Sequence, residues 1–301
     1  LSACSCRLFI GEKPIPSQTI EDLSTEITED ELKEAFIDEW GVKYSKDGRK
    51  LLKAPKELRR GYSVKEGTRI ICNKAFSTCT SLTSIVIPNS VVSIGDGAFS
   101  GCLLLEYISI PKSVICLNGN PFYDWNGKLE CLSPNFIYED DVLFNKDKSE
   151  IVSFRNQNIE SYIIPDSVIS IGDGAFYSCS SLSNIVIPNS VTDIGNSAFS
   201  FCRSLTNIVI PNSVTAIGDS AFSDCRSLTN IVIPDSVTAI GNFAFWGCSS
   251  LSNIVIPDSV TAIGDYAFYY CSLSNIVIPD SVTAIGICAF PYFCDTILSK
   301  S

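Results

Sequence analysis

The sequence contains no histidine among its 301 residues. A chain without histidine cannot build a Ser-His-Asp or Cys-His catalytic centre, and it cannot hold a metal ion through imidazole. Its cysteines form no C-x-x-C pair, which argues against a zinc site, and no glycine-rich phosphate loop is present. These absences exclude most familiar hydrolase mechanisms, and we expect neither an enzyme nor a cofactor.

Positive charge is also scarce, because 22 Lys and Arg residues stand against 33 Asp and Glu residues and leave a net charge of −11. No basic patch stands out, and no run of 18 apolar residues could form a membrane-spanning helix. Such an acidic chain is repelled by nucleic acid and by anionic lipid. We therefore expect neither of them as a direct partner.

The sequence does contain a repeat of 23 residues, for example RSLTNIVIPNSVTAIGDSAFSDC at residues 203–225. Proline marks its register at Pro88, Pro111, Pro165, Pro188, Pro211, Pro234 and Pro257, while Pro279 comes one residue early. Degenerate copies reach back to Tyr62, so the chain encodes about ten turns. A constant period predicts a solenoid, whose function lies on a repetitive surface rather than in one pocket.

Each repeat begins with an alternating, β-branched segment, LTNIVI at residues 205–210. This pattern predicts a strand with Ile208 and Ile210 inward, and stacked copies predict a parallel sheet with one strand per turn. Gly218 and Asp219 then predict a bend and an N-cap before a helical piece of one or two turns. Because one unit cannot bury its own apolar residues, Phe222 is expected in a core shared between turns.

The repeat L-x-x-I-x-I-P-x-S-V-x-x-I-G-x-x-A-F-x-x-C resembles the leucine-rich repeat in the variant named after the BspA surface proteins of Bacteroidetes. The resemblance covers roughly residues 62–293. It implies an α/β, horseshoe-like solenoid with a concave parallel β-sheet, short helical turns on the convex side, and a bacterial surface protein. Where an ordinary leucine-rich repeat has an asparagine ladder, this chain has Ser90, Ser113, Ser167, Ser190, Ser213, Ser236, Ser259 and Ser281. A serine hydroxyl can still donate to a carbonyl of the neighbouring turn.

Two segments outside the period resemble each other, GVKYSKDGRKLLKAP from Gly41 and DVLFNKDKSEIVSFR from Asp141. Both predict a hairpin of two alternating strands around a KDG or KDK turn. We therefore expect hairpin inserts at about 41–61 and 130–160, within a repeat domain that spans 41–301.

Residues 1–40 form the remaining N-terminal segment. Thr28 and Glu31 make a capping box, which predicts a helix at about 29–40 that ends at Gly41. Leu32, Phe36 and Trp40 share one face of such a helix. We expect this face to cover the core of the first turn.

Seven of the 14 cysteines occupy one column of the repeat: Cys79, Cys102, Cys179, Cys202, Cys225, Cys248 and Cys271. Neighbouring turns stack about 4.8 Å apart, a Cα separation that a disulfide tolerates. The side chains of one column point in parallel, however, and free cysteine packs well as a small apolar residue. We expect buried free thiols.

Acidic residues recur at turns, at Asp219, Asp235, Asp258, Asp265 and Asp280, and cluster once at Glu139, Asp140 and Asp141. The turn residues suit capping and solubility, with a calcium-binding or cation-binding surface as the alternative. The cluster suits a hairpin turn, with a glycosidase carboxylate pair as the alternative that would need a cleft.

Two surfaces are candidate binding sites. Aromatic residues gather around the predicted convex turns, at Tyr177, Phe201, Phe243, Trp246, Tyr266, Tyr269 and Tyr270. The predicted concave sheet carries an asparagine column, Asn184, Asn207, Asn230, Asn253 and Asn275, beside a valine column, Val186, Val209, Val232, Val255 and Val277. Exposed aromatics are typical contact anchors, although some of them pack between turns. The two columns suit an extended protein or a glycan, or are neutral residues copied by duplication.

The ends of the sequence carry two further expectations. LSAC at residues 1–4 resembles a bacterial lipobox, in which Cys4 would carry a lipid anchor, or is simply where the sequence starts. At the other end, AFPYFCDTILSKS at residues 289–301 is an incomplete repeat without a comparable cap, so we expect either a truncated sequence or an open strand edge that favours self-association.

Two classes of function remain open. The first, implied by the family resemblance, is a cell-surface or secreted adhesin-like protein that binds host matrix proteins or other microbes. The second is a structural module for assembly within a larger envelope protein. A glycan-binding module is a further alternative, and loss of the aromatic cluster should impair a binding module only.

Overall fold

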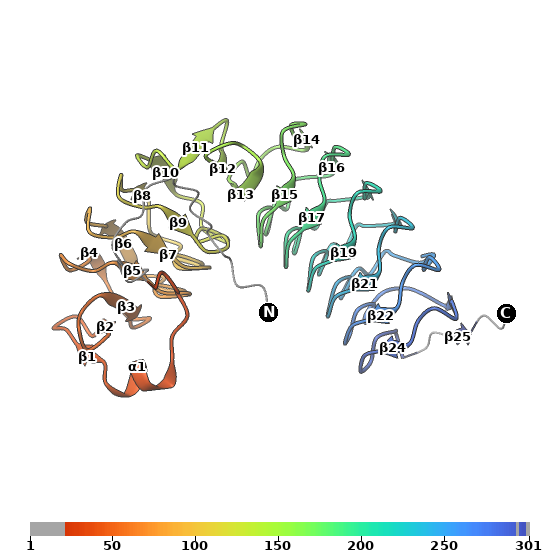
Figure 1. Cartoon of the computed structure of the whole chain (residues 1–301), viewed down its shortest axis with the longest axis horizontal. Helices are drawn as coiled ribbons and strands as arrows, with labels where there is room; N and C mark the ends of the chain where they lie inside the picture. The colour runs from red at the N-terminus through yellow and green to blue at the C-terminus, as the bar shows by residue number, and fades with distance from the viewer. Residues whose placement is uncertain (1–21, 293–294, 299–301) are drawn as a thin grey trace, which may run out of the picture. The chain divides into compact units, whose positions relative to one another are not determined.

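The computed structural model describes residues 22–292 and 295–298 (Figure 1). The chain divides into two compact units between Asn135 and Phe136, inside the insert predicted at 130–160. Both units are stacks of short turns in which parallel strands follow one another along the chain. The predicted solenoid is confirmed.

In the second unit, the predicted strands of four successive turns form one parallel ladder, here called the NIV sheet. Its strands are β14 (Ser161–Ile163), β16 (Asn184–Val186), β18 (Asn207–Val209) and β20 (Asn230–Val232). Equivalent residues of successive repeats face each other, as Asn207 faces Asn230. The same segment forms β23 (Asn275–Ile278), which pairs in parallel with β25 (Asp295–Leu298). The predicted parallel strand is thus present in these turns, whereas the equivalent residues 251–257 form no strand.

A second ladder, here called the AI sheet, was not predicted. Its strands are β11 (Phe136–Glu139), β12 (Val142–Asn145), β13 (Glu150–Phe154), β15 (Ser170–Ile171), β17 (Asp193–Ile194), β19 (Ala216–Ile217), β21 (Ala239–Ile240), β22 (Ala262–Ile263) and β24 (Ala284–Ile285). Most of these strands have two residues, which is too short for the alternation that marks a strand in a sequence.

The two ladders lie on different sides of the second unit. Figure 1 shows β14 and β16 along the outer edge of this unit's curve, with the AI strands from β15 to β24 on the concave side of them. The AI sheet therefore takes the place expected for a concave parallel sheet, and the NIV strands lie outside it. The AI ladder is continuous through the second unit, whereas the NIV ladder is interrupted between β20 and β23.

The core of the second unit is a stack of equivalent side chains. Phe199, Phe222 and Phe245 are fully buried, and their ring centroids lie 5.4 Å apart with nearly parallel planes. The cysteine column is buried as predicted, and its thiols are free. Six of the seven thiols donate to a carbonyl of the preceding turn, as Cys225 Sγ donates to Phe199 O at 3.1 Å.

The first unit begins differently from the prediction. The helix α1 spans only Glu29–Lys33, although the Thr28–Glu31 capping box is present. The chain then forms β1 (Phe36–Ile37), so the helix predicted at 29–40 is wrong beyond Lys33. Leu32, Phe36 and Trp40 are exposed and do not form a buried helical face. Instead of a helix, antiparallel pairing of β1 with β2 (Lys43–Tyr44) covers the end of the sheet.

Both predicted hairpins are present. In the first, β2 pairs antiparallel with β3 (Lys50–Lys53), and in the second β12 pairs antiparallel with β13, each with a register shift. The second strand of each hairpin starts a parallel ladder of the repeat. Asp140 and Asp141 form the turn between β11 and β12, both with positive φ, so the acidic cluster belongs to a hairpin turn.

The other strands of the first unit repeat the same two ladders. They are β4 (Arg60–Ser63) paired with β6 (Leu82–Val86), β8 (Tyr107–Ile110) paired with β10 (Lys128–Cys131), and β5 (Ile70–Ile71), β7 (Ser93–Ile94) and β9 (Cys116–Leu117) continuing from β3. Lys65 takes the place of the repeat proline, and its Nζ lies 5.0 Å from the Phe36 ring centroid.

Polar columns connect the turns. Five hydroxyls of the predicted serine column donate to a carbonyl of the preceding turn, as Ser236 Oγ donates to Val214 O at 2.6 Å. The predicted role does not extend to the whole column, because the buried hydroxyls of Ser190 and Ser281 have no hydrogen-bond partner. Asp219, predicted to be a helix N-cap, instead belongs to a ladder of Asp and Asn side chains. It accepts from the backbone N–H of Asn242, and its own N–H donates to Asn196 Oδ1. The segment after it forms hydrogen-bonded turns rather than a helix.

Candidate functional site

The candidate site is built on the turn that follows each AI strand. This turn has two left-handed backbone positions, four residues apart. The first column is Gly174, Ser197, Ser220, Phe243 and Tyr266, and the second is Ser178, Phe201, Asp224, Gly247 and Tyr270. Glycine adopts this conformation freely, whereas other residues lose roughly 1–2 kcal/mol each.

Four of the predicted aromatic residues occupy these strained positions. Their φ angles are +62° for Phe201, +55° for Phe243, +54° for Tyr266 and +62° for Tyr270. Large side chains are rare in the left-handed region. Stability alone would favour glycine at these sites, so the aromatic side chains are retained against a conformational cost.

Aromatic rings of adjacent turns form a continuous surface, here called the aromatic patch: Phe243, Tyr266, Tyr269 and Tyr270. The rings of Phe243 and Tyr266 stack with centroids 5.1 Å apart and planes 8° from parallel. Tyr266 meets Tyr269 edge-on at 5.6 Å, and Tyr269 meets Tyr270 at 4.4 Å. Phe243 is 39% exposed and Tyr270 61% exposed. The structure thus brings four predicted site residues together, and part of their aromatic surface is exposed to solvent.

The predicted residues Tyr177 and Phe201 lie apart from the patch, because the turn that carries Ser220 and Asp224 separates them from Phe243. Their rings are 5.3 Å apart, and the Arg203 guanidinium lies 5.5 Å from the Phe201 ring centroid. Both residues are half-buried. They form a smaller aromatic pair, and the seven predicted aromatics do not make one surface.

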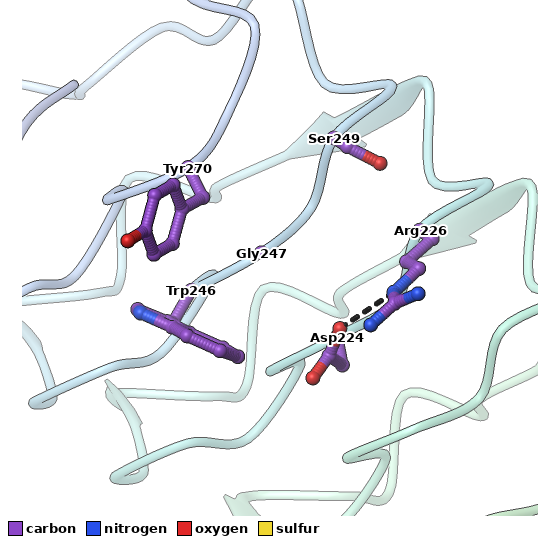
Figure 2. A pocket seen from close by; sticks show the side chains of 6 residues that line it. All are labelled: Asp224, Arg226, Trp246, Gly247, Ser249 and Tyr270. Carbon is purple, nitrogen blue, oxygen red and sulfur yellow. Dashed lines mark hydrogen bonds and ion pairs between the residues drawn. The ribbon is translucent and has the colours of Figure 1, made fainter.

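Beside the aromatic patch lies a shallow, open hollow of about 290 Å³. Figure 2 shows Trp246 and Tyr270 on one side of it and Asp224 with Arg226 on the other. The Trp246 and Tyr270 rings are nearly perpendicular, with centroids 5.5 Å apart. Gly247 and Ser249 complete the lining.

The charged residues of the hollow form an ion pair. Arg226 Nε donates to Asp224 Oδ1 at 2.7 Å. The Asp224 side chain is only 6% exposed, whereas that of Arg226 is 56% exposed. The backbone N–H of Asp224 donates to Trp246 O, which fixes this turn against the next. The hollow therefore carries donors and acceptors without a net charge.

The asparagine and valine columns face solvent. Their members on β16, β18 and β20 lie on the NIV sheet, those on β23 lie on a separate strand pair, and Asn253 and Val255 lie on a segment without a strand. All five asparagines, Asn184, Asn207, Asn230, Asn253 and Asn275, are exposed, and the valines are 48–79% exposed. Asn184 Nδ2 donates to Ser161 Oγ at 3.3 Å. The columns form an uncharged face, which the alternation of the strand predicted, although on the outer rather than the concave side.

Sequence reasoning missed Asp224, Arg226, Gly247 and Ser249. The signal that could have found them is the second left-handed column, where Gly247 interrupts a series of larger residues between Asp224 and Tyr270. That column is visible only when the repeats are compared position by position with the backbone conformation known.

Two further alternatives from the sequence were a cation-binding surface and a lipid anchor. Among residues 22–292 and 295–298, no group of three or more Cys, Asp or Glu side chains could hold a metal ion. Within the same ranges, no helix has the length and apolar character required to span a bilayer. Cys4, the predicted lipidation residue, lies outside the described residues.

The chain is similar to known repeat proteins. The family described as "BspA type Leucine rich repeat region" matches residues 62–146, 148–231 and 215–298, in six copies. No curated protein has a significant match to the sequence.

Solved structures share the fold. A leucine rich cell surface protein from Faecalibacterium prausnitzii A2-165 is 30% identical, with a TM-score of 0.65 over 82% of this chain and 61% of that one. This chain thus spans less than two thirds of that protein. A leucine-rich repeat protein from Eubacterium ventriosum is 24% identical, with a TM-score of 0.56 over 82% and 85% of the two chains. The pneumococcal vaccine antigen PcpA is 22% identical, with a TM-score of 0.54 over 81% and 58%. The last two likenesses concern the fold alone.

Proposed function

This chain belongs to the BspA-type leucine-rich repeat family, and we propose that it is a non-enzymatic, adhesin-like binding protein of a bacterial surface. Its partner in this proposal is a protein of the host matrix or of another microbe. The aromatic patch is the surface that anchors the partner. The proposal rests above all on the aromatic residues held at left-handed backbone positions.

Strain of this kind is informative because it opposes stability. Residues in sparsely populated backbone regions cost about 1–3 kcal/mol each and cluster at functional sites. Phe243 and Tyr266 could be replaced by glycine without loss of core packing, because neither side chain is buried. Their retention therefore suggests a role outside the fold, and exposed aromatic rings are frequent energetic centres of protein interfaces.

The surface location is supported by the relative from Faecalibacterium prausnitzii, which is described as a cell surface protein. An anchor through Cys4 would be one route to such a location. The non-enzymatic part of the proposal is supported by the sequence, which has no histidine for the common nucleophile–base centres.

Binding of the purified chain to immobilised matrix proteins and to intact bacterial cells tests the proposal. The test variant is Phe243→Ser with Tyr266→Ser, which removes the stacked pair of the patch. The matched control is Val209→Ser with Val232→Ser, because these side chains are 70% and 66% exposed on the NIV sheet. We expect the patch variant to bind at least about 30-fold more weakly, the effect of losing a hot spot of about 2 kcal/mol.

A second candidate function, a structural module for assembly, is favoured by the uncharged NIV face. Exposed β-branched side chains in register at each turn could pack against another envelope component. If the valine variant loses a partner and the aromatic variant does not, the assembly function replaces the adhesin-like one. If both variants bind matrix proteins and cells as the unaltered chain does, the aromatic patch is not the binding surface.

A further inference from the structure

The hollow beside the aromatic patch exists because one side chain is missing from a column. Gly247 stands in the second left-handed column between Asp224 and Tyr270, with φ of +72°. Turns of the stack are about 4.8 Å apart, so the two flanking side chains start about 10 Å from each other. A Cβ atom on Gly247 would lie 3.2 Å from Asp224 Oδ1 and would begin to fill this gap.

The two walls of the hollow differ in chemistry. Trp246 is half-buried and Tyr270 exposed, and their perpendicular rings form an aromatic corner. Opposite them, the carboxylate of Asp224 holds the guanidinium of Arg226 through Nε and thereby fixes its orientation. A guanidinium has five N–H donors, and the Arg226 side chain is 56% exposed, so it keeps donors for a ligand beyond its bond to the largely covered Asp224 carboxylate. Ser249 adds a hydroxyl group at the edge.

These walls discriminate between classes of ligand. A cationic ligand would meet the guanidinium of Arg226, and an anionic ligand would approach a chain of net charge −11. A wholly apolar ligand would cover the ion pair without replacing its water, which costs free energy. The remaining class is a neutral molecule with one apolar face and several hydroxyl groups along its edge.

A hexopyranose has this chemistry, because one face presents C–H groups and the rim presents hydroxyls that both donate and accept. C–H groups pack favourably on the negative face of an indole or phenol ring. Hydroxyls of the rim can accept from the exposed guanidinium of Arg226 and bond to the hydroxyl of Ser249. We propose that the hollow between Trp246, Tyr270 and the Asp224–Arg226 pair binds one neutral pyranose ring of a surface glycan.

The size of the hollow agrees with one ring. Its volume of about 290 Å³ lies just below the roughly 300–1,000 Å³ typical of pockets for drug-sized molecules, as a site for a single ring should. Because the hollow is open, the sugar could be the end of a longer chain or a glycan attached to a protein. The inference rests on the proposed function, since Tyr270 belongs to both the patch and the hollow.

The test uses methyl glycosides of glucose, galactose, mannose and N-acetylglucosamine with the full chain. Saturation-transfer NMR detects binding, and the change in tryptophan fluorescence that is lost in Trp246→Ala reports on stacking, because Trp40 and Trp125 also emit. Gly247→Tyr fills the hollow and should fold, because Phe201 and Tyr270 occupy the same backbone position. Phe243→Ser is the matched control, because it removes part of the patch and leaves the hollow unchanged.

We expect at least one glycoside to bind saturably, with binding about 10-fold weaker in Gly247→Tyr and in Trp246→Ala. Phe243→Ser should bind within about two-fold of the unaltered chain. Failure of all four glycosides to saturate overturns the inference, as does unchanged binding by Gly247→Tyr. If Gly247→Tyr blocked the binding of a peptide ligand but of no glycoside, the hollow would be assigned to a protein side chain. That result would also overturn the inference.

The same variants separate this inference from the proposed function. Gly247→Tyr enlarges the aromatic surface while it closes the hollow. If it still binds matrix proteins and Phe243→Ser with Tyr266→Ser does not, the proposed function stands without the sugar site. If glycosides bind but no protein or cell surface does, the sugar site stands alone.

Discussion

The side chain of Asp219 joins two turns of the solenoid through Asn242. Asp219 Oδ1 accepts from the backbone N–H of Asn242 at 2.7 Å, and Oδ2 accepts from Asn242 Nδ2 at 3.4 Å. In the same way, Asp173 Oδ1 accepts from the backbone N–H of Asn196, and Asn242 Oδ1 accepts from the backbone N–H of Asp265. Aspartate and asparagine alternate in this ladder, so neighbouring carboxylates are separated by a neutral amide.

Asp219→Ala should lower the free energy of unfolding by about 1 kcal/mol, because it removes the acceptor of an inter-turn hydrogen bond at an exposed site. Asp219→Asn should change it by less than about 0.5 kcal/mol, since an amide oxygen accepts equally well at Asn196 and Asn242. Denaturant titration measures both. Equal losses in the two variants would mean that charge, rather than the accepted hydrogen bond, matters at this position.

Phe222→Ala should lower the free energy of unfolding by about 3–5 kcal/mol, because it opens a cavity in the middle of the ring stack. Phe222 is fully buried between Phe199 and Phe245. Phe222→Leu should cost less, since it fills most of the volume. Denaturant titration of the two variants measures the effect. A loss below about 1 kcal/mol for alanine would show that the stack relaxes around the missing ring.

Phe243→Gly should leave the free energy of unfolding within about 1 kcal/mol of the unaltered chain, or raise it, because glycine relieves the left-handed backbone strain. The stacking contact with Tyr266 is lost at the same time and offsets part of the gain. Thermal and denaturant unfolding measure the balance. A loss as large as that of Phe222→Ala would show that Phe243 stabilises the fold, and would weaken the argument for a functional role.

The repeat period and the inward apolar positions were sufficient to predict the stacked solenoid, the NIV strands and the buried cysteine column. The AI strands were not predicted, because a strand of two residues, such as Ala216–Ile217, is too short to show an alternation of apolar and polar residues. Asp219 was assigned to a helix cap because an Asp after a Gly bend is typical of an N-cap, whereas its actual partner lies one turn away. Such a contact between residues 23 positions apart depends on how the turns stack, so the local sequence around Asp219 does not reveal it.

The N-terminal helix was predicted to be longer than it is. The capping box of Thr28 and Glu31 was predicted and is present, but the helix stops at Lys33. Phe36 stacks on Tyr44 with ring centroids 5.4 Å apart, and β1 pairs with β2. Strand pairing at the end of a sheet thus overrides a helical pattern that propensity alone supports.

The candidate site was predicted only in part. Aromatic residues that differ between otherwise equal repeats were easy to find, and four of them do form one patch. The hollow was not predictable, because it depends on the absence of a side chain at Gly247 and on the orientation of Arg226. Both follow from backbone geometry rather than from composition.

The buried thiols make stability depend on pH. Burial raises the pKa of the Cys102 thiol from 9.0 to about 12. In the unfolded chain the thiol ionises near pH 9, whereas in the folded chain it stays protonated. Above pH 9 the folded state therefore binds more protons than the unfolded state. The contribution of this thiol to the free energy of unfolding is complete below pH 9 and is lost as the pH rises toward 12.

Between pH 8 and pH 10, the Cys102 thiol alone should lower the free energy of unfolding by about 1.4 kcal/mol. Cys102→Ala removes the titrating group, so its unfolding free energy should fall less steeply over this range. The two titration curves, each from urea unfolding at fixed pH, should converge by about that amount as the pH rises, while the other ionising groups act equally on both. Parallel curves would contradict the prediction, because they would mean that this thiol ionises in the folded chain as easily as in the unfolded one.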